Sequence, residues 1–230
     1  MSWAYADDAI ITQVDDGHPG LEGTGRRISS SASMPRIVAQ MLAYCAVHPG
    51  QRVLEIGTGT GRNLPPLRAA VGPTGAIYGV DISTGMLDQA DALCAENGWS
   101  NVNLIQQDAA EFTPPEPLDG VMFGLSYNTM PHHLAVLHHA WNLLRPGGRL
   151  VVMDAKLPPG LGGRLILPFS LWLMKRTMLG NPLIKPWEDV ARLAGTIEME
   201  QFMFGSWYIC TAVKPATTAA TKPAATTAAA

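Results

Sequence analysis

Short apolar runs alternate with stretches of helical periodicity between residues 34 and 213. Each apolar run is short and bounded by turn-forming residues, which predicts strands at 52–56, 76–80, 102–106, 119–125 and 149–154. In the stretches between them, apolar residues recur every three or four positions, which predicts helices at 64–71, 84–98 and 131–144. This alternation indicates an α/β fold, with a parallel sheet covered by helices on both faces.

The pattern changes after residue 154. Residues 155–187 are rich in Pro, Gly and Leu and are interpreted as an insertion or cap near the mouth of a site. Within them, 165–174 (LILPFSLWLM) is too short to span a bilayer, which needs about 20 apolar residues. A buried helix is expected there, with an interfacial helix as the alternative. Residues 196–213 hold two strand-like runs broken at Gly205, which predicts an antiparallel hairpin at the sheet edge.

Composition divides the chain into three parts. Of its 230 residues, 47% are hydrophobic and 15% are charged, which is typical of a globular domain. Residues 214–230 contain no aromatic residue and no acid, so a disordered Ala/Thr/Pro tail is expected. The predicted division is an N-terminal arm or lid at 1–33, one domain at 34–213 and the tail at 214–230. No feature indicates an oligomeric state.

Charge and cysteine usage exclude several classes of function. A net charge of −3 gives no basic field for nucleic acid. The three cysteines are far apart and the N-terminus lacks a basic leader, so a reducing cytoplasmic setting is expected. Two HH pairs, His132–His133 and His138–His139, lie on one predicted helix, where adjacent residues point about 100° apart and few of the four can converge, so no metal site is expected.

A glycine-rich turn follows the first predicted strand. VLEIGTGTG spans residues 53–61, and its glycines can take positive φ and let a ligand lie against the backbone. The spacing is GxGxG rather than the GxGxxG of dinucleotide sites, and Glu55 would repel a pyrophosphate. A carboxylate there instead favours a cationic ligand, such as S-adenosylmethionine, which carries an ammonium and a sulfonium group.

Two further acids follow the next two predicted strands. Asp81 is placed to accept hydrogen bonds from ribose hydroxyls, and Asp108 from an adenine amino group. Met86 is either an adenine contact or a core residue. Simpler roles stay open: Asp81 and Asp108 as helix caps or turn residues, and Glu55 as a partner of backbone amides.

Four segments together resemble the class I S-adenosylmethionine-dependent methyltransferases: VLEIGTGTG, VDIS, QQDAAEF and LRPGGRLVVMD. The resemblance covers roughly 100 residues, and the combination is specific. It implies a Rossmann-like sheet of seven strands, mostly parallel with an antiparallel last strand, and S-adenosylmethionine as cofactor. The implied cofactor-binding residues are Glu55, Gly57, Thr58, Gly59, Gly61, Asp81, Ile82, Met86, Asp108, Ala109 and Gly124.

Two parts of the chain indicate different acceptors. SxPxIVAxM, from Ser33 to Met41, resembles the protein-L-isoaspartate methyltransferases, which implies that Ser33 lies near the transferred methyl group. The alternative is that Ser33 caps the helix beginning at Pro35. From Leu118 onward the chain resembles the quinone and phospholipid methyltransferases.

The sequence therefore predicts methyl transfer to a small, partly apolar acceptor that is lipid-like or quinone-like. The alternatives are a peptide carboxyl methyltransferase and a nucleoside-binding module without turnover. Contact with a membrane through 165–174 is an open expectation. Candidate acceptor-binding residues are Tyr127, Asn128 and His133, and candidate catalytic residues are Ser33, His132 and His133. The alternatives are a solvated helix start for the two histidines and a turn role for Tyr127 and Asn128.

Overall fold

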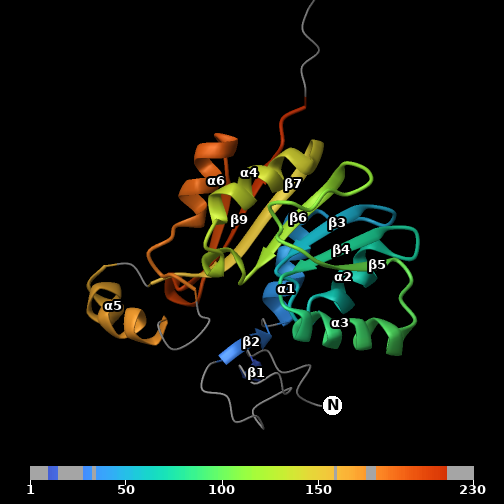
Figure 1. Cartoon of the computed structure of the whole chain (residues 1–230). Coiled ribbons are helices and arrows are strands. Elements are labelled where there is room, and N and C mark those ends of the chain that lie inside the picture. The colour runs from blue at the N-terminus through green and yellow to red at the C-terminus, as the bar shows by residue number, and fades with distance from the viewer. Residues whose placement is uncertain (1–9, 15–27, 33–34, 158–159, 175–179, 217–230) are drawn as a thin grey trace, which may run out of the picture.

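A seven-stranded sheet forms the centre of the molecule (Figure 1). The computed structural model describes residues 10–14, 28–32, 35–157, 160–174 and 180–216. Five strands are parallel, and β9 is antiparallel to both of its neighbours. In spatial order the strands are β5 (Val102–Gln106), β4 (Ala76–Asp81), β3 (Arg52–Ile56), β6 (Leu118–Gly124), β7 (Leu144–Ala155), β9 (Trp207–Val213) and β8 (Glu198–Phe202).

Helices cover both faces of this sheet because its strands are apolar on both sides. Along β3, Val53 packs into one hydrophobic cluster and Leu54 into the other. One face carries α1 (Pro35–Cys45), α2 (Leu64–Val71) and α3 (Thr84–Asn97); the other carries α4 (His133–Leu143) and α6 (Pro186–Ala194). The predicted three-layer α/β fold is confirmed.

The predicted antiparallel hairpin at the sheet edge is confirmed. β9 inserts between β7 and β8, so β8 is the edge strand, and a 3-10 turn at Met203–Gly205 joins the pair. The sequence pattern did not predict two further features: the helix α6 and a separate antiparallel pair of strands, β1 (Ile10–Val14) and β2 (Ile28–Ala32).

The expectation of a buried helix at 165–174 is wrong. α5 (Leu161–Met174) stands beside the body of the protein (Figure 1), and Leu165 and Phe169 are 79% and 61% exposed. Apolar composition alone does not distinguish a core helix from one whose apolar face meets solvent. Within the described ranges, none of the helices has both the length and the apolar character needed to cross a bilayer.

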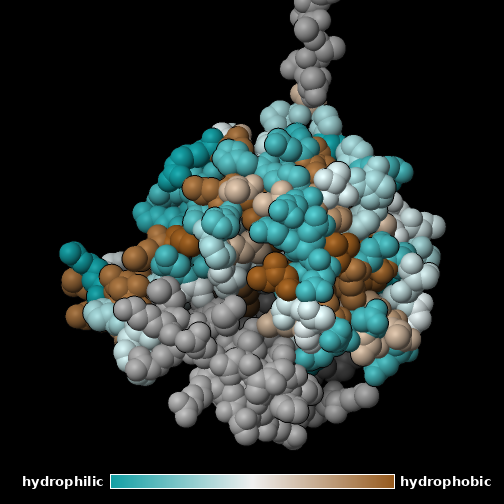
Figure 2. All heavy atoms as spheres, viewed as in Figure 1, coloured by the Kyte–Doolittle hydropathy of each residue, from teal (hydrophilic) through white to brown (hydrophobic). Residues whose placement is uncertain are grey.

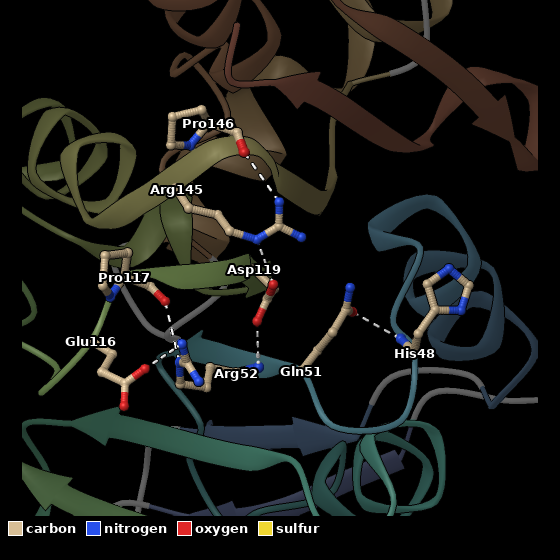
Figure 3. A network of polar contacts seen from close by, with 8 residues as sticks. All are labelled: His48, Gln51, Arg52, Glu116, Pro117, Asp119, Arg145 and Pro146. Atoms are coloured by element: carbon tan, nitrogen blue, oxygen red, sulfur yellow. Dashed lines mark hydrogen bonds and ion pairs between the residues drawn. The ribbon is translucent and has the colours of Figure 1, made fainter. Parts of the chain in front are cut away.

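Polar side chains pair with one another where the parallel strands begin, an edge of the sheet termed here the amino edge (Figure 3). The Asp119 carboxylate accepts from the Arg52 backbone N–H at 2.8 Å and from Arg145 Nε at 2.6 Å. The Arg52 guanidinium pairs with Glu116 at 2.5 Å. This network joins the starts of β3, β6 and β7, so it fixes the strands at the end opposite the glycine turn.

Candidate functional site

The glycine turn lies where β3 ends, at the opposite edge, termed here the carboxyl edge. Gly57, Gly59 and Gly61 all have positive φ, at 74°, 55° and 75°. A Cβ on Gly57 would lie 2.4 Å from the Cβ of Ser126, which follows β6. Glycine is therefore required at Gly57 both by its backbone conformation and by the close approach of another chain segment.

Glu55 is buried directly beneath this turn. It is 1% exposed, and its carboxylate accepts from Thr58 Oγ1 and Asn63 Nδ2, each at 2.7 Å. Burial raises the pKa of Glu55 to about 7, although both hydrogen bonds oppose the shift. Its partners are side chains, not the backbone amides considered from the sequence. Glu55 thus braces the turn and is also a carboxyl group whose charge a nearby cation would stabilise.

Asp81 ends the neighbouring strand β4 and is tied to the same turn. One carboxylate oxygen accepts from the Gly59 N–H and the other from the Ser83 N–H, each at 2.9 Å. Ile82, the next residue, is 73% exposed, and Met86 is half-buried on α3. Asp81 therefore has the turn role left open from the sequence, at an edge where a ligand could also reach it.

Asp108 follows β5 and is exposed at the same edge. Its carboxylate accepts from the Ala110 N–H at 2.9 Å, and Ala109 between them is buried. Because β3, β4 and β5 are parallel neighbours, Glu55, Asp81 and Asp108 come from one edge of the sheet. The acids supply hydrogen-bond acceptors, which suits the donor groups of a ribose, an amine and an ammonium.

The segment after β6 closes over the turn from the other side. Gly124 lies against Asn63, since a Cβ there would be 2.9 Å from Asn63 Nδ2. Leu125 has a φ of 59°, a conformation that is strained for a branched side chain. Ser126 Oγ then donates to the Ile56 carbonyl at 2.5 Å. The sequence did not predict roles for Ser126 and Asn63, because the Ser126–Ile56 and Gly124–Asn63 contacts join segments that are distant in the chain.

A buried polar cluster lies next to this segment. Asn128 and Asp154 are 6% and 4% exposed, and the Asp154 carboxylate accepts from the backbone N–H groups of Asn128 at 3.3 Å and Ala155 at 2.8 Å. Tyr208 pairs with Asp154 in the β7–β9 register and is fully buried. Burial raises the pKa of Asp154 to about 7 and also raises the pKa of Tyr208, to which the Asp154 charge contributes.

Several polar atoms of this region have no hydrogen-bond partner among the described residues. They are Asn128 Oδ1, Tyr208 Oη and His133 Nδ1. Buried polar atoms are normally satisfied, so these three indicate a place where a polar molecule or water completes the bonding. Asp154 and Tyr208 were not among the residues expected from the sequence. They come together only because β7 pairs with β9, and that pairing is not visible in a local sequence pattern.

The histidines do not converge. His133 Nε2 lies 3.9 Å from the Asp189 carboxylate, which also accepts from Tyr127 Oη at 3.2 Å. His139 Nε2 is 2.6 Å from the Phe112 carbonyl oxygen, and His132 is exposed at the start of α4. Of the candidate catalytic residues, only His133 therefore lies in the buried polar region; Ser33 is outside the described residues.

Two surface hollows lie away from the glycine turn. One, of about 450 Å³, lies between α3 and β5 beside Cys94 and Trp99. The other, of about 400 Å³, lies between α4 and α6 and is lined in part by His133, Asp189 and Arg192. Of these two hollows, only the second is lined by a residue, His133, that is expected from the sequence to bind an acceptor.

Known proteins resemble this chain in both sequence and structure. Residues 53–148 match the model of a methyltransferase domain. A demethylmenaquinone methyltransferase of Geobacillus sp. (strain WCH70) is 28% identical over 148 residues, which cover 64% of this chain and 63% of that protein, just under two thirds of its length.

Solved structures add the fold. A SAM-dependent methyltransferase from Aquifex aeolicus, 19% identical, superposes with a TM-score of 0.57 and covers 76% of this chain and 88% of its own. A protein-L-isoaspartate O-methyltransferase, 25% identical, gives a TM-score of 0.54 and covers 66% of this chain and 43% of its own.

Proposed function

We propose that the chain is a class I S-adenosylmethionine-dependent methyltransferase and that it methylates a small, partly apolar acceptor of quinone-like chemistry. The observation that carries this proposal is the carboxyl edge itself, where a glycine turn, three acids and a buried polar cluster meet. The Geobacillus relative is a demethylmenaquinone methyltransferase, which supports a quinone as the acceptor class.

We assign the cofactor to the glycine turn and the acids around it. When bound there, S-adenosylmethionine supplies a methyl group on a sulfonium, which is a good leaving group. The chain then has to hold the reacting atoms in line and exclude water, and alignment alone can contribute about 7–11 kcal/mol. The proposed contacts are Glu55, Gly57, Thr58, Gly59, Gly61, Asp81, Ile82, Met86, Asp108, Ala109 and Gly124.

The acceptor is assigned to the polar cluster beyond β6. Tyr127, Asn128 and His133 supply hydrogen-bonding groups there. Asn128 Oδ1 and His133 Nδ1, which have no hydrogen-bond partner among the described residues, support that role. A quinol or other carbon acid must lose a proton as it is methylated. His133, beside the Asp189 carboxylate at 3.9 Å, is the better placed of the two candidate histidines to accept it.

A peptide carboxyl acceptor is the second candidate. The resemblance of residues 33–41 to the isoaspartate methyltransferases and the structural similarity to one of them favour it. It requires Ser33 near the methyl group, and it makes a methyl ester rather than a carbon–methyl bond.

The setting we propose is the cytoplasm, with contact to the membrane interface through 165–174 because a quinone-like acceptor is lipid-soluble. All three cysteines are free thiols, which supports a reducing compartment.

One experiment tests both acceptors. Purified protein is incubated with cofactor labelled in the methyl group and with either a demethylated quinol or an isoaspartyl peptide. We expect label in the quinol, stable to base, and none in the peptide. Base-labile label in the peptide would replace the first proposal with the second, and cofactor binding without any transfer would favour a nucleoside-binding module.

A further inference from the structure

α5 presents a stripe of large apolar side chains to solvent. Leu161, Leu165, Phe169 and Trp172 are spaced four, four and three residues apart, so they share one face of the helix. Their exposed fractions are 76%, 79%, 61% and 49%, and the rings of the last two stack at 5.7 Å. Figure 2 shows hydrophobic atoms on the surface in the region of α5. A contiguous patch of this kind marks a binding surface.

The charge around this stripe selects the kind of partner. Residues 155–187 contain five basic residues and no acidic residue, whereas the whole chain has 16 basic and 19 acidic residues. Arg164 is exposed on α5 itself. Lys185 pairs with Glu188 at 2.7 Å and Lys156 lies over the Trp187 ring, so Arg164 is the exposed cation described on the helix itself. Apolar side chains flanked by basic residues in the sequence are typical of helices that lie in the interface of an anionic membrane. A second copy of this acidic chain could cover the stripe but would not explain the absence of acids.

A second exposed apolar element lies at the same end of the sheet. Met203 and Phe204, in the turn between β8 and β9, are 53% and 99% exposed. The Lys156 N–H donates to the Ser206 carbonyl at 2.8 Å, so the start of the 155–187 segment lies beside this turn. Both elements adjoin the end of β7, at the carboxyl edge that holds the glycine turn.

We propose that α5 and the Met203–Gly205 turn dock on an anionic lipid surface and hold the carboxyl edge toward the bilayer. This inference rests on the proposed function in one respect: docking would serve to bring in a lipid-soluble acceptor. The docking itself depends on the exposed side chains and the charge, so it can be tested without any acceptor.

The test is sedimentation of the full chain with phosphatidylcholine vesicles that contain or lack phosphatidylglycerol. We expect binding to the anionic vesicles, weaker binding to the neutral ones, and a loss with added salt. Phe169→Glu should weaken binding about tenfold or more, because it places a charge in the apolar interface. Arg164→Gln should weaken it less, and only on anionic vesicles.

Val213→Glu is the matched control. Val213 is 45% exposed at the opposite end of β9, so the same change of charge there should leave vesicle binding intact. Absence of vesicle binding, or equal losses in Phe169→Glu and Val213→Glu, would overturn the proposal. So would a wild-type dimer that Phe169→Glu converts to monomer without any change on vesicles, since the stripe would then join two copies. Titration of S-adenosylhomocysteine into each variant separates failure of docking from failure of the cofactor site.

Discussion

The two edges of the central sheet use polar groups in opposite ways. At the amino edge, Asp119 joins Arg52 and Arg145 at 2.6–2.8 Å, so each charge has an opposite charge or a peptide group as its partner (Figure 3). At the carboxyl edge, Glu55 and Asp154 are buried carboxyl groups that have no cationic partner among the described residues, and burial raises the pKa of each to about 7. The first arrangement stabilises the fold, whereas the second leaves groups whose ionisation a ligand can change.

The carboxyl edge also carries local backbone and hydrogen-bonding costs. The carboxyl edge contains the positive φ values of the glycine turn and of Leu125, and unmet polar atoms on Asn128 and Tyr208. Natural sequences accept such local costs mainly at functional sites. If this contrast is correct, substitutions at the carboxyl edge should change ligand binding and those at the amino edge should change only stability.

The largest effect is expected from Gly57→Ala. A Cβ there would lie 2.4 Å from the Ser126 Cβ at a positive φ, so we expect a loss of about 3 kcal/mol or more in the free energy of unfolding. Affinity for S-adenosylhomocysteine should fall about 100-fold. Gly98→Ala is the control, because its φ is also positive but nothing lies within 4 Å. Calorimetry and chemical denaturation measure both; equal affinities in the two variants would remove the cofactor from this turn.

Asp154 should make stability depend on pH. Its pKa rises from 3.8 in the unfolded chain to about 7 in the fold, so the folded state binds more protons between those values. The stabilisation is complete below about pH 4 and is lost as pH rises through 7. Asp154→Asn should flatten this part of the curve, leaving the slope that Glu55 contributes. Denaturation of both proteins across this range tests it, and identical slopes would contradict the burial argument.

Much of this contrast was predictable from the sequence, and the exceptions have a common cause. Strand ends and the glycine turn depend on local patterns, so Glu55, Asp81 and Asp108 were correctly expected at one edge. Tyr208 and Ser126 reach the same region only through pairing between distant strands, which no local pattern records. The prediction that residues 165–174 form a buried helix was wrong for a related reason: the sequence of an apolar helix does not indicate whether another element will cover it.

Exchange of one carboxylate at each edge tests the contrast directly. Asp81→Asn should lower affinity for S-adenosylhomocysteine about tenfold, because a charged acceptor for the ribose hydroxyls is lost. Asp119→Asn should leave that affinity unchanged but lower the free energy of unfolding by about 1–2 kcal/mol, since two donors lose their charged acceptor. The comparison fails if Asp119→Asn weakens binding as much as Asp81→Asn.

Glu55 should give cofactor binding a pH dependence. With a pKa of about 7 in the free protein, Glu55 is partly protonated at neutral pH. A ligand ammonium favours the carboxylate, so binding releases a proton and affinity should rise up to about tenfold from pH 6 to pH 8. Glu55→Gln should remove this dependence, whereas Asp154→Asn should keep it. A pH profile that survives in Glu55→Gln would assign the titration to another group.

The smallest effect is expected from Glu116→Gln at the amino edge. Its side chain is 62% exposed, and its pairing with Arg52 at 2.5 Å is screened by water and salt. We expect a loss below about 0.5 kcal/mol in the free energy of unfolding, larger at low ionic strength, and no change in affinity for S-adenosylhomocysteine. Denaturation at two salt concentrations measures it. A loss that also reduced affinity would mean that the two edges are coupled through the strands, and the division of labour between them would have to be abandoned.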